Sequence, residues 1–91
     1  MLELIAIGSS PDQRATTRLE PGRELRIGRN PQLELTIPWD RHLSRHHITL
    51  IADDDNTVRL QAQPEASNPV FSDGHPVTTA SLTTGDFFVI G

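Results

Sequence analysis

Short segments in which apolar and polar residues alternate are the feature that most limits what this chain can fold into. Leu25 and Ile27 alternate with polar neighbours, and the same spacing recurs over residues 48–52 and 57–63. Six glycines and seven prolines interrupt these segments, and no apolar pattern keeps a helical period for ten or more residues. A period of two is typical of strands that bury one face. The sequence therefore predicts an all-β protein made of many short strands.

Turn signals separate the predicted strands. Asp73-Gly74 is typical of a type I′ hairpin turn, and residues 53–56 form an acidic turn. Short strands at regular spacing predict an antiparallel β-sandwich or a small barrel. The expected strands cover residues 2–7, 14–19, 24–27, 33–37, 47–52, 57–63, 70–71 and 87–90, with a return strand that starts at Pro76-Val77.

The length and composition of the chain exclude several classes of protein. With 91 residues it is long enough for one core and too short for two, so we expect a single domain over residues 1–91. Because the chain starts at a methionine, we expect it to be the N-terminal module of a longer protein. It has no cysteine, which excludes disulfides and thiolate metal sites. No apolar run reaches the length of a membrane span or of a signal peptide, so we expect a cytoplasmic protein.

Positive charge is gathered in one segment of an acidic chain. The formal net charge is −4, from eight arginines, no lysine and twelve acidic residues. Residues 23–47 contain five of the arginines and three of the acids, so this segment carries +2 and the remainder −6. A negative chain does not favour general binding to nucleic acid or to an anionic membrane. Solvated strand edges would explain the arginines equally well on charge alone, but an arginine fork also matches phosphate oxygens.

Five short motifs, in this order along the whole chain, resemble the forkhead-associated (FHA) domain family. They are Gly28-Arg29, Ser44-Arg45-His46-His47, Ser67-Asn68, Asp73-Gly74 and Gly85-Asp86. The family pattern is Gly-Arg, then Ser-x-x-His about fifteen residues later, then an Asn-Gly-Thr stretch, a second Asn-Gly turn and a closing Gly-Asp strand. The resemblance implies an eleven-stranded β-sandwich that binds phosphothreonine peptides on the loops at one end. Here it implies about ten to eleven short strands.

The resemblance also implies roles for individual residues. Arg29 would grip the phosphate, Ser44 would contact it, and Arg45 would supply a second guanidinium. Ser67 and Asn68 match the two positions that touch the phosphothreonine and the peptide backbone. The expected phosphopeptide-binding residues are therefore Arg29, Ser44, Arg45, Ser67 and Asn68.

Two more residues are expected to support the site. Gly28 allows the backbone to turn tightly before the arginine, and His47 is expected to brace the loops without touching the ligand. The chain departs from the family pattern at Asn68-Pro69-Val70, where the family has Asn-Gly-Thr. Because Pro69 has a fixed φ and restricts the residue before it to extended conformations, we expect a reshaped loop there.

The resemblance further implies one more strand beside the first, and the last strand is missing from this chain after Gly91. We therefore expect either that the sequence stops short of the domain's last strand or that an edge near residues 2–7 is left open. Unpaired backbone groups on such an edge can pair with another chain. This gives the expectation of a weak self-association through the first strand.

Some side chains have a second explanation. Arg29 could form an ion pair with Glu24, Glu34 or Asp40. Asn68 could be only a turn former. Trp39 could pack under its loop or flank a bound peptide.

The sequence offers no catalytic or metal site that competes with this interpretation. The three acids at 53–55 precede Asn56 and are better explained as a polar hairpin tip. His46 and His47 are adjacent in an extended segment and face opposite ways, so a zinc site with His42 or His75 is not expected. The sequence lacks the common hydrolase, metalloprotease and phosphate-loop signatures.

We therefore expect a phosphothreonine-peptide binding module for signalling that is not an enzyme. We expect it to need no cofactor and no metal, and to bind neither nucleic acid nor membranes. The alternative is a degenerate FHA-like scaffold, which would mediate phosphate-independent protein interaction or self-association.

Overall fold

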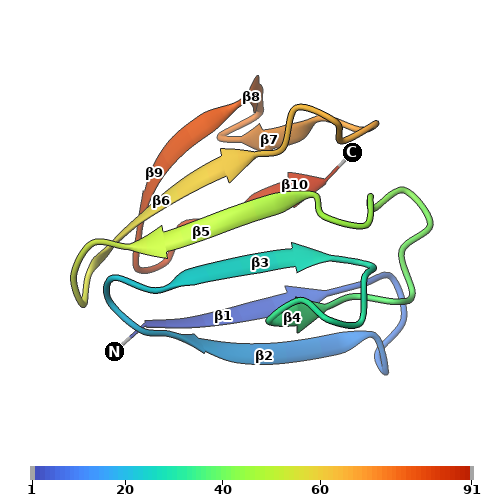
Figure 1. Cartoon of the computed structure of the whole chain (residues 1–91), viewed down its shortest axis with the longest axis horizontal. Coiled ribbons are helices and arrows are strands. Elements are labelled where there is room, and N and C mark those ends of the chain that lie inside the picture. The colour runs from blue at the N-terminus through green and yellow to red at the C-terminus, as the bar shows by residue number, and fades with distance from the viewer. Residues whose placement is uncertain (1, 91) are drawn as a thin grey trace.

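The computed structural model describes residues 2–90, and the two ends of the predicted domain, Met1 and Gly91, lie outside the described residues. These residues form ten strands and no helix, so the described part of the chain has no helix long enough to span a membrane (Figure 1). The predicted all-β class is confirmed. The strands are β1 (Leu2–Ile7), β2 (Arg14–Leu19), β3 (Glu24–Gly28), β4 (Leu35–Thr36), β5 (Ile48–Ala52), β6 (Thr57–Ala62), β7 (Val70–Ser72), β8 (His75–Val77), β9 (Thr79–Thr83) and β10 (Phe88–Ile90).

The strands form a sandwich in which one layer is continuous and the other is divided. The continuous layer is a five-stranded sheet with the order β4-β3-β5-β6-β9. The divided layer consists of the β1-β2 hairpin and a three-stranded sheet with the order β10-β7-β8. Neighbouring strands are antiparallel except β3 and β4, which are parallel. This pair departs from the purely antiparallel sandwich that we expected.

The core lies between the layers, because alternate residues of the central strands point inward. In β3, Leu25 and Ile27 are both buried, which confirms the face predicted from their spacing. In β5, the side chains of Ile48, Leu50 and Ala52 are buried together on the corresponding face. Removing this apolar surface from water is the main force that holds the two layers together. The buried apolar residues are Leu19, Leu25, Ile27, Leu35, Ile37, Leu43, Ile48, Leu50, Ala52, Val58, Leu60, Val70 and Leu82.

Both predicted hairpin turns are present. In the β5–β6 turn, the Asp54 carboxylate accepts the backbone N–H groups of Asn56 and Thr57, each at 2.8 Å. These bonds to the charged form lower the pKa of the Asp54 carboxyl. In the β7–β8 turn, Asp73 and Gly74 have φ values of 54° and 79°. A type I′ turn requires positive φ at both positions, which explains the Asp-Gly pair.

Two strands differ from the sequence prediction. The strand expected over 33–37 is only two residues long, because Leu33 belongs to a turn in which its N–H bonds the Asn30 carbonyl at 3.2 Å. The strand Thr79–Thr83 was not predicted, since Leu82 is its only fully buried residue. It forms an edge of the five-stranded sheet by pairing with β6.

The order of the central strands determines where the loops meet. Because β3, β5 and β6 are antiparallel neighbours, the C-terminal end of β3, the N-terminal end of β5 and the C-terminal end of β6 lie at the same end of the sheet. The connections at this end lie at the right of Figure 1. They are residues 29–34, 37–47 and 63–69, and we call them together the loop cluster.

Candidate functional site

Hydrogen bonds of the backbone and of one side chain join the three connections of the loop cluster. The backbone N–H groups of Arg29 and Asn30 donate to the carbonyls of Ser44 and Arg45, at 3.1 and 3.2 Å. The Ser67 N–H donates to Ser44 Oγ at 3.2 Å, which joins the third connection to the second. Residues that are far apart in the sequence are therefore held side by side.

Arg29 begins the first connection and is oriented toward the second. Its side-chain Nε donates to the carbonyl of Leu43, and the residue itself is exposed. Within residues 2–90, no carboxylate lies at ion-pair distance from Arg29. The alternative of an ion pair with Glu34 is wrong, because Glu34 pairs with Arg26. The terminal nitrogens of the Arg29 guanidinium are thus available for an anion.

Gly28 permits the close approach of the second connection. A Cβ added at this position would lie 2.6 Å from the carbonyl carbon of Arg45 and 2.8 Å from the carbonyl oxygen of Ser44. Both of these are backbone atoms and cannot rotate away. A side chain at position 28 would therefore push apart the two connections that carry Arg29 and Arg45.

Ser44 and Arg45 present donors beside Arg29. Ser44 is half-buried, and because its Oγ accepts the Ser67 N–H, its own hydroxyl hydrogen remains able to donate. Arg45 is exposed, and the structure gives its guanidinium no partner among residues 2–90. Arg29, Ser44 and Arg45 thus combine two guanidinium groups and one hydroxyl at one end of the sandwich.

His47 lies beneath these residues and has no exposed surface. Its Nδ1 accepts the backbone N–H of Ser44 at 2.9 Å. Nε2 must therefore carry the ring proton, and it donates to the Asn68 carbonyl at 2.9 Å. The imidazole thus links the second connection to the third from inside the protein.

Ser67 and Asn68 lie in the third connection, next to the second. The Asn68 side-chain Nδ2 donates to the His42 carbonyl at 2.7 Å, so this amide group holds two loops together. Its Oδ1 remains as a possible acceptor for a peptide N–H. A peptide contact by Asn68 therefore stays a prediction, and Ser67 and Asn68 lie in a bend before Pro69.

A second hydrogen-bonded group lies on the other side of the same loops, and no sequence motif predicted it. Thr49 Oγ1 is 2.9 Å from His46 Nε2 and accepts the Gln63 side-chain N–H at 3.0 Å. Thr49 is buried although it is polar. A threonine in a strand normally indicates only an exposed β position. His46 thus contacts Thr49, whereas the adjacent His47 bonds Ser44 and Asn68.

The first connection is tied to β3 by an ion pair that the sequence did not reveal. The Arg26 guanidinium donates to both carboxylate oxygens of Glu34 at 2.7 and 2.9 Å, and the Arg26 backbone N–H donates to the same group at 2.8 Å. These hydrogen bonds, together with the positive charge, lower the pKa of the Glu34 carboxyl to about 2. The pair closes the loop that starts at Arg29.

The site is therefore suited to an anion. Asp40 is the acidic residue closest in sequence to Ser44 and Arg45, and its carboxylate accepts the His42 backbone N–H at 2.9 Å. Trp39 packs against the core, which is one of the two explanations considered for it. Among residues 2–90 no group of three His, Asp or Glu side chains is placed to hold a metal. Two guanidinium groups and a hydroxyl can donate to the oxygens of a phosphate.

Comparison with known proteins points to the same family as the sequence motifs. The family model described as FHA domain matches residues 25–91. The FHA domain of FhaA, solved in complex with the intracellular domain of Rv3910, is 25% identical with a TM-score of 0.75, and the match covers 98% of this chain and 89% of that one. A domain solved in a structural and functional analysis of phosphothreonine-dependent FHA domain interactions has the same identity of 25% and TM-score of 0.75, with 98% and 84% covered.

A third solved structure shows the same fold at lower identity. The FHA domain of the CT664 protein from Chlamydia trachomatis is 21% identical with a TM-score of 0.79, over 98% of this chain and 86% of that one. No curated protein matches the chain in sequence.

Proposed function

The chain belongs to the FHA domain family, and from this premise we propose that its loop cluster binds peptides phosphorylated on threonine. FHA domains are protein-interaction modules, and phosphothreonine binding is their general function. The observation that carries the proposal for this chain is the junction of Arg29, Ser44 and Arg45 through hydrogen bonds between their loops.

The charges and donors of this junction suit a phosphothreonine. At neutral pH the phosphate carries about −1.5 to −2 charge and three acceptor oxygens. Arg29 and Arg45 together supply two positive charges, and Ser44 adds a hydroxyl donor. A hydrogen bond to a charged group contributes about 1.5–3 kcal/mol. Loss of one arginine should therefore weaken binding tenfold or more.

The preference for threonine over serine depends on one methyl group. Burying it contributes about 0.8 kcal/mol, and a pocket that also fixes the phosphate angle would add to this preference. We propose that Ser67 and Asn68 form the wall that meets this methyl group and the adjoining peptide backbone. The hydrogen bond from the Ser67 N–H to Ser44 Oγ supports this assignment, because Ser44 is a proposed phosphate ligand.

Fluorescence anisotropy with degenerate peptide pools tests the proposed function. Three pools that share their flanking positions would carry phosphothreonine, phosphoserine or threonine at the centre. We expect saturable binding of the phosphothreonine pool, weaker binding of the phosphoserine pool and none of the unphosphorylated pool. Equal binding of the phosphorylated and unphosphorylated pools would refute the proposal and favour a phosphate-independent scaffold.

The Arg29→Ala variant locates the site. It should reduce affinity for the phosphothreonine pool at least tenfold without a large change in Tm, since exposed arginines add little stability. The matched control is Arg18→Ala, which removes the same charge from an exposed position on β2 outside the loop cluster. If the two variants lost affinity equally, the affinity for the phosphopeptide would depend only on the net charge of the domain, and Arg29 would not be a ligand of the phosphate.

A further inference from the structure

The loop cluster contains one exposed arginine that the proposed phosphate site does not use. Arg41 lies in the second connection and is exposed to solvent. Arg23, Arg26 and Arg59 each form an ion pair with a carboxylate of the domain. Within residues 2–90, Arg41 forms no such pair. Its guanidinium is therefore available to pair with an acidic group of a ligand.

The turn that carries Arg41 is fixed by its own hydrogen bonds and by the core. The Asp40 carboxylate accepts the backbone N–H of His42 at 2.9 Å. The Asp40 carbonyl accepts the backbone N–H of Leu43 at 3.3 Å, and the side chain of Leu43 is buried. The turn over residues 40–43 thus has a defined position in the loop cluster.

Side chains of two proposed site residues also hold this turn. Arg29 Nε donates to the carbonyl of Leu43, and Asn68 Nδ2 donates to the neighbouring carbonyl of His42 at 2.7 Å. Arg41 is two residues from Leu43 in the chain, so their Cα atoms lie at most about 7 Å apart. The position proposed for the phosphate and the position of Arg41 are therefore close to each other, and the same hydrogen bonds fix both.

Arg41 is left without a negative partner when Arg29 and Arg45 hold a phosphate. Phosphothreonine carries about −1.5 to −2 charge at neutral pH, which the two positive charges of Arg29 and Arg45 already balance. Within residues 2–90, the acidic side chains of the loop cluster do not lie at ion-pair distance from Arg41; they are Glu34, Asp40 and Glu65. The partner that remains for Arg41 is an acidic residue of the peptide itself.

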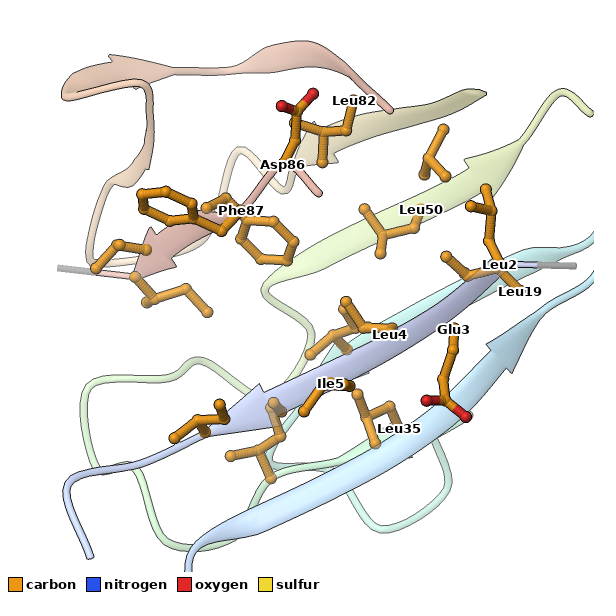
Figure 2. Close-up of a pocket in the computed structure, with 18 of the residues that line it drawn as sticks. Leu2, Glu3, Leu4, Ile5, Leu19, Leu35, Leu50, Leu82, Asp86 and Phe87 are labelled. Atoms are coloured by element: carbon orange, nitrogen blue, oxygen red, sulfur yellow. The ribbon is translucent and has the colours of Figure 1, made fainter. Parts of the chain in front are cut away.

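An acidic peptide residue finds no positive partner in the hollow that β1 and β10 line. The charged residues that line this hollow are all acidic, and Figure 2 shows two of them, Glu3 and Asp86. The net charge of −4 also disfavours acidic peptides as a class. A preference for an acidic residue must therefore come from an arginine close to the bound phosphate.

We propose that Arg41 selects phosphothreonine peptides that carry an acidic residue on one side of the phosphothreonine, within about four positions of it. This inference rests on the proposed function and names the class of peptide that the same site prefers. An extended peptide advances about 3.3–3.6 Å per residue, so a more distant side chain would lie beyond the reach of Arg41. The guanidinium fork matches a carboxylate through two parallel hydrogen bonds. An exposed pair of this kind should raise affinity about two- to fivefold.

A positional scan of phosphothreonine peptides tests the selection by fluorescence anisotropy. Each of the four positions on either side of the phosphothreonine would carry glutamate, glutamine or lysine in turn, in an otherwise neutral peptide. We expect one position, or two neighbouring ones, at which glutamate binds about two- to fivefold more tightly than glutamine and lysine binds more weakly. Effects of equal size at every position would overturn the proposal, because they would indicate a response to peptide charge alone.

Charge reversal at Arg41 assigns the preference to this residue. Arg41→Glu should bind the lysine peptide more tightly than the glutamate peptide at the same position, with a Tm near that of the parent. Damage to the fold would lower affinity for all peptides and would not reverse their order. The matched control is Arg18→Glu, which makes the same charge change on β2 outside the loop cluster and should keep the preference for glutamate. An Arg41→Glu variant that still prefers glutamate would overturn the proposal.

The same scan separates failure of this inference from failure of the proposed function. Unphosphorylated versions of the peptides serve as the reference. Binding that does not depend on the phosphate would refute the proposed function and this inference with it. Phosphate-dependent binding without a preferred position for glutamate would overturn the role of Arg41 alone.

Discussion

His47 shows how one buried side chain can control a site that it does not touch. Its two ring nitrogens bond the Ser44 N–H and the Asn68 carbonyl, so two of the three loops depend on one imidazole. The sequence motif suggested this bracing role, and the geometry explains it. The ring is neutral in this arrangement, because one nitrogen accepts while the other donates.

We expect His47→Ala to destabilise the domain by about 2–4 kcal/mol, since it leaves a cavity and two unpaired backbone groups. Thermal unfolding should show a lower Tm, and affinity for phosphothreonine peptides should fall at temperatures where the variant is folded. His75→Ala is the matched control, because that histidine is exposed on β8. An unchanged Tm in His47→Ala would show that the imidazole does not brace the loops.

Gly28 acts in a different way from His47, because its lack of a side chain allows its backbone to approach the backbone of residues 44 and 45 closely. Gly28→Ala should cost about 1–3 kcal/mol, since the added methyl group must displace the backbone of residues 44 and 45. We expect weaker phosphopeptide binding, because Arg29 and Arg45 would move apart. Thermal unfolding and anisotropy measure the two effects. Unimpaired binding by this variant would contradict the importance of the close approach.

At the scale of elements, the connection after β3 depends on the Arg26–Glu34 pair. The pKa of Glu34 is about 2 in the folded protein, below its ordinary value of 4.5. A carboxyl with a lowered pKa stabilises the fold above its unfolded pKa, and this contribution disappears as pH falls toward the folded pKa. Because the pair is partly exposed, solvent screening keeps the contribution small.

Glu34→Gln should therefore lower Tm by about 1–5 °C at pH 7. The difference from the parent should shrink as pH is lowered from 4.5 toward 2, where the parent carboxyl takes up a proton. Thermal unfolding across this pH range provides the measurement. The control is Glu20→Gln, which removes an exposed acid that pairs with Arg23 at 3.5 Å. A Tm difference that stayed constant with pH would contradict the assignment.

Some strands could be predicted from the sequence and others could not. Strands with clear alternation, such as β3 and β6, lie where the pattern placed them, because alternate residues of each are buried. β4 is shorter than expected because the Leu33–Asn30 turn uses part of the apolar run. β9 gave little signal because an edge strand with one fully buried residue has almost no periodic pattern.

At the scale of the whole molecule, the site residues could be proposed from motifs because each loop carries at least one of them. The Arg26–Glu34 and His46–Thr49–Gln63 contacts could not be predicted, because they join strands and loops whose register is decided only by the tertiary fold. The internal bond from Asn68 to the His42 carbonyl has the same origin.

The whole molecule separates its charges. The loop cluster presents the exposed guanidinium groups of Arg29 and Arg45 at one end of the continuous sheet, whereas the chain outside residues 23–47 carries a formal charge of −6. This separation explains how a chain with a net charge of −4 can still attract a phosphate.

We propose that the three connections of the loop cluster form one phosphothreonine site. The most direct measurement is a titration of the ¹⁵N-labelled domain with a phosphothreonine peptide, followed through backbone amide chemical shifts. We expect the largest changes at Arg29, Asn30, Ser44, Arg45 and Ser67, and no such changes with the unphosphorylated peptide. Changes confined to β1 and β10, or changes of equal size with both peptides, would contradict the claim.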